Sequence, residues 1–297
     1  MSLRDFVIFV LVCLGWATSV ILAKFAMADL GMPPLFFALL RTLLVAAALS
    51  RCLWPLPAMP VRVLVATMLL GGGSFALLFI GLKTASASSA SIVALSGAPM
   101  TVLFAIAFLG ERIGWHRGFG MFLTLAGVGV VVADPSGLKG SLGLIYVAAS
   151  AVAGALGSVL LKQLVDTPAL TLQAWAGASG SLLLLPLSLL LEQHQLASAM
   201  AGGWPLIGCV AFSGLIVSVV GHTTYYKLLQ KYDANLIAPL TLMTPLFTIV
   251  LGVVVMGDKP TAGLAVGGCL AMLGVTITVI RPTRSLPKWL LLRNPVD

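Results

Sequence analysis

Apolar runs of about 20 residues recur along the whole chain, with only short polar breaks between them. A helix needs a run of this length to cross the hydrocarbon core of a bilayer. Only 9% of the 297 residues are charged and 60% are hydrophobic, whereas soluble domains carry roughly a quarter charged residues. The runs therefore predict an all-α integral membrane protein with no room for a soluble domain.

The limits of these runs, marked by Gly, Pro and charge, predict ten transmembrane helices. Twelve of the 17 Lys and Arg residues fall on the side of the N-terminus, four fall on the other side, and Arg41 lies inside the second span. Because basic loops stay cytoplasmic, we expect a multi-pass protein of the plasma membrane, the inner membrane of a bacterium, with both termini inside. The expected spans are 5–27, 33–53, 61–82, 86–109, 115–133, 141–163, 169–191, 205–229, 234–256 and 261–280.

Other readings of the same composition are less favoured. The first run, followed by small residues at 26–28, has the outline of a cleaved secretory signal, but its length and Lys24 favour an uncleaved helix. The net charge of +8 includes no basic run interleaved with aromatic residues, so no nucleic-acid partner is expected. The four cysteines stand singly, and we expect neither a metal nor a cofactor.

Features of the first half of the chain return in the second half. Placing Glu111 over Asp258, 147 residues later, also places Gly120 over Gly267. Further matches are Gly127 with Gly274, Pro99 with Pro245, Pro34 with Pro168, and WATSVILAK (16–24) with GALGSVLLK (154–162).

These matches predict two five-helix halves, 1–137 and 138–282, followed by a basic cytoplasmic tail, 283–297. Because five is odd, the second half enters the membrane from the opposite side, which makes the repeat inverted. Inverted repeats underlie many secondary transporters, whose substrate sites lie near the membrane midplane. Glu111 and Asp258 are then symmetry mates, and we assign them, with Lys24 and Lys162, to structural or gating roles.

The chain resembles the drug/metabolite transporter superfamily, specifically its ten-helix EamA-type members. The resemblance covers nearly the whole chain and implies an inner-membrane carrier that moves amino acids, drugs or other small metabolites, most often outward, by alternating access. The second half departs from the family pattern, with Asp258 in place of the usual Glu and Trp175 at roughly the place of Arg41. The stretches that carry the resemblance are LGWATSVILAKFA (14–26), LLRTLLVAAA (39–48), ASSASIVALSGAP (87–99), FLGER (108–112), DANLIAPLTLMTP (233–245) and MGDK (256–259).

Two polar side chains inside the spans are candidates for transport. Arg41 is the only charge well inside a span, where either pairing with protein groups or direct contact with substrate is open to it. His222 shares one helical face with Ser218, Tyr225 and Tyr226, at i, i+4, i+7 and i+8. It can carry a coupling proton or serve as a structural histidine, and the tyrosines can be interfacial.

The fourth and ninth spans carry small and polar residues that either pack helices or line a cavity. Pro99 and Pro245 each remove a backbone hydrogen bond, which predicts paired bends near the midplane. The GxxxG of GLAVG (263–267) predicts a close helix contact, within one protomer or in a homodimer. The expected cavity residues are Trp16, Arg41, Ser89, Ser96, Pro99, His222, Tyr225, Tyr226, Asn235, Thr241 and Pro245.

The sequence thus predicts a secondary transporter, not an enzyme, that exports a small neutral or zwitterionic molecule as a monomer or homodimer. An ATP-driven pump is disfavoured because no GxxxxGK[ST] sequence occurs. The alternatives are an intramembrane enzyme acting on a lipid or peptide, which needs paired acids or Ser with His at matching depth, and a passive channel. The inverted repeat favours alternating access over a fixed pore.

Overall fold

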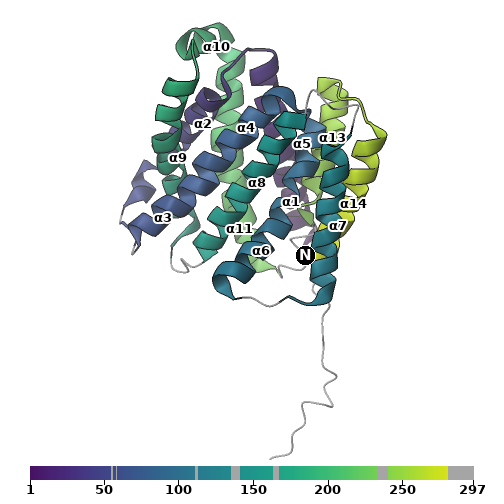
Figure 1. The fold of residues 1–297 in the computed structure, drawn as a ribbon. Helices are drawn as coiled ribbons and strands as arrows, with labels where there is room; N and C mark the ends of the chain where they lie inside the picture. The colour runs from purple at the N-terminus through teal and green to yellow at the C-terminus, as the bar shows by residue number, and fades with distance from the viewer. Residues whose placement is uncertain are drawn as a thin grey trace, which may run out of the picture.

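All regular elements in the described part of the chain are helices, and they stand side by side in one bundle (Figure 1). The computed structural model describes residues 1–54, 56–57, 59–110, 113–134, 141–162, 167–232 and 240–279, without the side chains of residues 141, 226, 229 and 230. The N-terminus lies at the lower end of the bundle in this view and α10 at the upper end. We call these the N-terminal end and the opposite end.

The elements follow one another in the order that the apolar runs predict. In chain order they are α1 Leu3–Ala28, α2 Pro34–Ala48, η1 Ser50–Leu53, α3 Pro60–Thr67, η2 Met68–Gly73, α4 Ser74–Thr84, α5 Ala87–Ala94, α6 Gly97–Leu109, α7 Trp115–Val132, α8 Ser141–Lys162, α9 Ala169–Leu191, α10 Gln195–Ala211, η4 Phe212–Gly221, α11 His222–Lys231, α13 Met243–Met256 and α14 Ala262–Val279.

Eight helical segments of the described residues are long and apolar enough to cross a membrane. Two shorter apolar helices, α2 and α13, fall within the second and ninth expected spans. Helices suit these runs because backbone groups in hydrocarbon must bond within their own segment. The third, fourth and eighth expected spans differ from single regular helices, since each is divided along its length.

The third and eighth spans each contain a π-helical segment at a corresponding place. The segment η2 begins at Met68 and η4 begins at Phe212, 144 residues later. π-Helical turns widen the hydrogen-bond spacing to i→i+5 and often occur at functional sites. Hydrophobic periodicity does not distinguish them from α-helix in a segment that is apolar all round, so the sequence predicted one continuous helix in each place.

Two helices end in the same way, just before the two acids that the sequence alignment pairs. Gly110 (φ 65°) caps the C-terminus of α6 and Gly257 (φ 69°) caps that of α13, both in the left-handed conformation. Glycine adopts this conformation without steric strain and therefore commonly terminates helices. Asp258 follows the second of these glycines, whereas Glu111 lies outside the described residues.

α7 and α14 lie side by side at one edge of the bundle (Figure 1) and meet through glycines. A Cβ atom on Gly120 would lie 2.7 Å from the Gly274 carbonyl oxygen, and one on Gly127 would lie 2.5 Å from the Gly267 carbonyl oxygen. Adding 147 to Gly120 gives Gly267, and adding 147 to Gly127 gives Gly274. Each contact therefore pairs one glycine with the repeat counterpart of the other, as in a two-fold symmetric interface. Gly267, the last residue of the GxxxG, thus makes its close contact within the protomer.

Candidate functional site

A cavity of about 220 Å³ lies roughly midway along α1, among helices of both halves of the chain. α1, α2 and α4 contribute to its lining from the first half, and η4 and α11 from the second. The lining is mainly aromatic and aliphatic, with a few polar side chains, which is the usual character of a small-molecule site. The lining residues are Trp16, Ser19, Val20, Arg41, Phe75, Leu78, Phe79, Val217 and His222.

Arg41 supplies the formal charge in this lining. It lies two turns into α2, its side chain is only 5% exposed, and its Nε and Nη2 atoms donate to Ser218 Oγ at 3.2 and 3.0 Å. Its guanidinium carbon lies 4.0 Å from the centroid of the Phe75 ring, close enough for a cation–π interaction. Arg41 therefore points into the bundle, where it bonds a protein group and also lines the cavity.

The π-helical segment η4 presents the acceptor for Arg41. Ser218 Oγ donates its hydrogen to the Ser213 carbonyl at 2.9 Å, five residues back, which leaves its lone pairs for the guanidinium group. His222 Nδ1 lies 3.0 Å from the Val217 carbonyl, again five residues back. If Nδ1 donates there, the neutral imidazole keeps Nε2 as an acceptor. Because the helix is π-helical up to Gly221 and α-helical from His222, the regular α-helical spacing predicted for this face does not hold between Ser218 and His222.

Trp16 joins the cavity to a second hollow. Its ring lies 5.5 Å from the ring of His222 and 5.2 Å from that of Tyr225. Within the described residues its Nε1 atom is buried without a hydrogen-bond partner. Trp16 also lines a groove of about 210 Å³ between α1 and η4, whose walls include the exposed side chains of Leu11, Ile216 and Val220.

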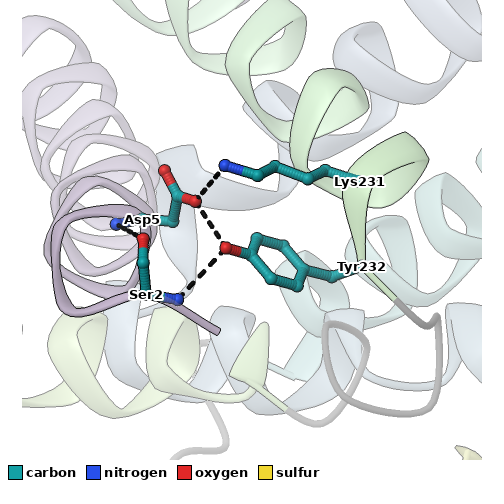
Figure 2. Close-up of polar contacts among 4 residues, drawn as sticks. All are labelled: Ser2, Asp5, Lys231 and Tyr232. Atoms are coloured by element: carbon teal, nitrogen blue, oxygen red, sulfur yellow. Dashed lines mark hydrogen bonds and ion pairs between the residues drawn. The ribbon is translucent and has the colours of Figure 1, made fainter.

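A polar cluster joins the start of α1 to the end of α11 at the N-terminal end (Figure 2). Asp5 Oδ2 accepts hydrogen bonds from Lys231 Nζ at 2.6 Å and from the Tyr232 hydroxyl at 2.5 Å. The backbone nitrogen of Ser2 donates to the same Tyr232 oxygen at 3.1 Å. Because Asp5 belongs to the first half of the chain and Lys231 to the second, the cluster holds the two halves together at this end.

Lys24 and Asp258 hold helix ends at the opposite end of the bundle. Lys24 Nζ donates to the carbonyls of Leu82 and Ala85, at 2.8 and 2.9 Å, where α4 ends. Asp258 Oδ2 accepts from the backbone nitrogen and hydroxyl of Ser88, at 3.0 and 2.7 Å, where α5 begins. Both placements are favourable, because a helix dipole attracts a cation to its C-terminus and an anion to its N-terminus.

Glu192 plays a similar part that the sequence did not reveal. Its carboxylate accepts from the backbone nitrogens of Leu35 and Phe36 at 2.7 and 2.9 Å, and Ser188 Oγ donates to it at 2.8 Å. It therefore satisfies the first turn of α2, the helix that carries Arg41. The available signal was an acid that directly follows an apolar run, but acids in such places are common and do not indicate their partner.

The structure brings together only some of the expected cavity residues. Trp16, Arg41 and His222 line the cavity, and Tyr225 packs against Trp16. Asn235 and the side chain of Tyr226 lie outside the described part of the chain, and Lys162 ends α8. The remaining expected residues, found near the starts of α5, α6 and α13, are Ser89, Ser96, Pro99, Thr241 and Pro245.

Other lining residues were not singled out from the sequence. Ser19 and Phe75 lie within apolar or small-residue runs, where nothing distinguishes them from residues that only pack helices. The run of glycines at 71–73, just before Phe75, was the available signal. It marks the π-helical segment that brings η2 close to α8 and α9.

An all-helical bundle of apolar segments with a partly polar cavity between them is typical of a multi-pass membrane protein. Residues 5–133 and 141–280 both match the model of the EamA-like transporter family. The chain belongs to this family and is a membrane transporter.

Two curated relatives resemble the chain over nearly its whole length, and a third over about two thirds of it. A probable amino-acid metabolite efflux pump of Salmonella typhimurium strain LT2 is 28% identical over 291 residues, covering 94% of this chain and 96% of that protein. The protein of the same description from Escherichia coli strain K12 is 26% identical, with the same coverage. A probable terminal-alkyne amino-acid exporter of Streptantibioticus cattleyicolor is 28% identical over 193 residues, 64% of this chain and 63% of that protein.

Proposed function

We propose that the chain is a secondary transporter that exports small neutral or zwitterionic metabolites, amino acids in particular, by alternating access. The observation that carries the proposal is the cavity midway along α1, lined by Arg41 and His222 and formed by helices of both halves. Its volume of about 220 Å³ is below the range of roughly 300–1,000 Å³ for drug-sized ligands, which favours a small metabolite. The names of the relatives that are described as amino-acid efflux pumps support the same class of substrate.

The proposed mechanism is a rocking motion of two inverted halves about this cavity. The exchange of contacts between α7 and α14, the two helix ends at Gly110 and Gly257, and the two π-helical segments support a two-fold relation between the halves. The Asp5–Lys231 cluster joins the halves at the N-terminal end of the bundle, and Asp258 with Ser88 joins them at the opposite end. Alternate opening then requires the two sets of contacts to break in turn.

Counterflow in proteoliposomes tests the transport activity. Vesicles containing the purified protein and loaded with one unlabelled L-amino acid are diluted into the same labelled amino acid, for each member of a panel. We expect rapid transient accumulation of label for at least one neutral amino acid, and none in vesicles without protein. Accumulation that persists when the internal substrate is omitted and equilibrates without overshoot indicates a channel instead. Absence of flux across the panel contradicts the proposed substrate class.

Cysteine labelling tests the proposed orientation, in which both termini are cytoplasmic. In a variant with Cys13, Cys52, Cys209 and Cys269 replaced, one cysteine is introduced at a time and treated with a membrane-impermeant maleimide in whole cells. Because Lys and Arg are concentrated on the N-terminal side, we expect labelling from outside in the 134–140 segment and protection in the 111–117 segment. The reverse pattern gives the opposite topology.

A further inference from the structure

The cavity holds a cation with no anion of its own. Arg41 is a buried residue, with only 5% of its surface exposed. Across the described residues it forms no ion pair, and no Asp or Glu is among the residues that line the cavity. An unpaired charge in so apolar a place is strongly unfavourable unless polar groups or a counter-ion compensate it.

Protein groups satisfy Arg41 only in part. Of the five N–H donors of a guanidinium group, one on Nε and one on Nη2 are directed to the same Ser218 oxygen. The Phe75 ring covers one face of the guanidinium plane but accepts no ordinary hydrogen bond. The two Nη1 donors and the second Nη2 donor have no protein acceptor within the described ranges, so the outer edge of the guanidinium plane keeps one free donor on each of Nη1 and Nη2 for another group.

The neighbouring polar groups complement this donor set. Trp16 Nε1 is a second buried donor without a partner in the described part of the chain, and its side chain lines the same cavity. His222, with Nδ1 at the Val217 carbonyl, offers Nε2 as an acceptor. The rest of the lining is apolar, from Val20, Leu78 and Phe79 among others. The cavity thus lacks a negatively charged hydrogen-bond acceptor and provides apolar surface for a small side chain.

We propose that Arg41 binds the carboxylate of the transported molecule, so that the substrates are small carboxylates with an apolar side chain. This proposal rests on the proposed transport function and specifies its substrate class. A carboxylate fits because it accepts two parallel hydrogen bonds from a guanidinium group and neutralises it. The amino group of an amino acid is then directed away from Arg41, toward acceptors and aromatic rings such as those of His222 and Trp16.

Four related compounds test the proposal on the unaltered full-length protein. L-Leucine and 4-methylpentanoate carry the carboxylate, whereas L-leucinamide and 3-methylbutylamine keep the same branched chain without it. Each is titrated into the detergent-purified protein, and the melting temperature is followed by intrinsic fluorescence. We expect the two carboxylates to raise the melting temperature with affinities at least about tenfold higher than those of the other two compounds. Equal responses, or no response to any of the four, overturn the proposal.

Substitutions separate binding by Arg41 from its contact with Ser218. Arg41→Gln removes the charge, and we expect the preference of at least about tenfold for L-leucine over L-leucinamide to disappear. Arg41→Lys keeps the charge without the planar fork and should retain part of the preference. Ser218→Ala removes the acceptor but not the guanidinium, so the preference should persist. Arg51→Gln, the same change at an exposed arginine of η1, is the matched control and should behave as wild type.

The two proposals fail in different ways. If the panel gives no counterflow, the proposed export of amino acids is wrong, whatever binds to the detergent-purified protein. If counterflow occurs but labelled 3-methylbutylamine is exchanged as well as L-leucine, transport stands and the carboxylate proposal is wrong. A preference for carboxylates that persists in Arg41→Gln also contradicts the role of Arg41. The wild-type titrations decide the outcome even if an Arg41 variant does not fold.

Discussion

We expect Gly127→Val to prevent formation of a stable folded protein, whereas Gly129→Val should be nearly neutral. A Cβ on Gly127 would lie 2.5 Å from the backbone nitrogen of Ala271 and from the Gly267 carbonyl oxygen. Backbone atoms do not move aside as a flexible side chain does, so α7 and α14 must separate along their length. Overpacking typically lowers the free energy of unfolding by about 1–3 kcal/mol. Because this substitution forces two helix backbones apart, we expect a loss at or above the upper end of that range.

The matched control uses the same substitution two residues further along the same helix. A Cβ on Gly129 meets no atom within 4 Å, so valine there adds bulk without a clash. Size-exclusion chromatography in detergent and thermal unfolding measure the outcome. We expect a lost or strongly diminished monodisperse peak for Gly127→Val and a near-normal peak for Gly129→Val. Comparable behaviour of the two variants would show that the α7–α14 contact is looser than the structure indicates.

The helix positions were predictable because membrane-spanning segments leave a clear signal in the sequence. A long apolar run lies in hydrocarbon, where no water is present to bond the backbone, and a helix bonds nearly all backbone groups within its own segment. The paired glycines were also visible at a 147-residue offset, but the offset aligns Gly120 with Gly267 and does not indicate that Gly120 meets Gly274 and Gly127 meets Gly267. The distinction between α- and π-helical turns was not visible, because Phe212–Gly221 is apolar or small at nearly every position and gives no periodic pattern.

The site was predictable only where a residue is chemically unusual for its surroundings. Arg41 and His222 stood out because a charge or an imidazole in hydrocarbon requires a reason. Phe75 and Ser19 did not stand out, since aromatic and small residues are ordinary in membrane helices. The acceptor of Arg41 is Ser218, 177 residues away in sequence. No local pattern indicates a pairing over that separation.

Pro99 and Pro245 occupy the same position near the start of a helix, in the fourth and the ninth expected spans, which makes the two prolines comparable. α5 ends at Ala94 and α6 begins at Gly97, with Pro99 as its third residue, while Pro245 is the third residue of α13. Proline has no N–H group to bond the carbonyl four residues back, which is that of Leu95 for Pro99 and that of Thr241 for Pro245. In both places the residue just before the proline donates to that carbonyl instead. Ala98 N donates to the Leu95 carbonyl at 3.1 Å, and Thr244 N donates to the Thr241 carbonyl at 2.9 Å.

We expect Pro99→Ala and Pro245→Ala to shift the accessibility of the cavity in opposite directions. Alanine restores the N–H donor, which lets the helix continue through the break and disfavours the bent form. The break before Pro99 lies nearer the opposite end of the bundle, because α5 begins there. In an inverted repeat its counterpart before Pro245 lies nearer the N-terminal end. A change from 1:1 to 10:1 between the two facing states requires only about 1.4 kcal/mol.

Single cysteines introduced by Leu78→Cys and Val217→Cys lie in the cavity lining. The rate at which an impermeant maleimide labels them from one side of the membrane reports whether the cavity is open to that side. Pro186→Ala is the matched control, because Pro186 is exposed inside α9 and lies at neither break. It should leave both labelling rates unchanged, while each of the other two variants should protect the cavity from one side and expose it to the other. If both variants change access from the same side with folding intact, the prolines only fit local packing and the halves do not rock as a related pair. Opposite shifts require that each half contributes one bend and that each bend helps close one side of the same cavity.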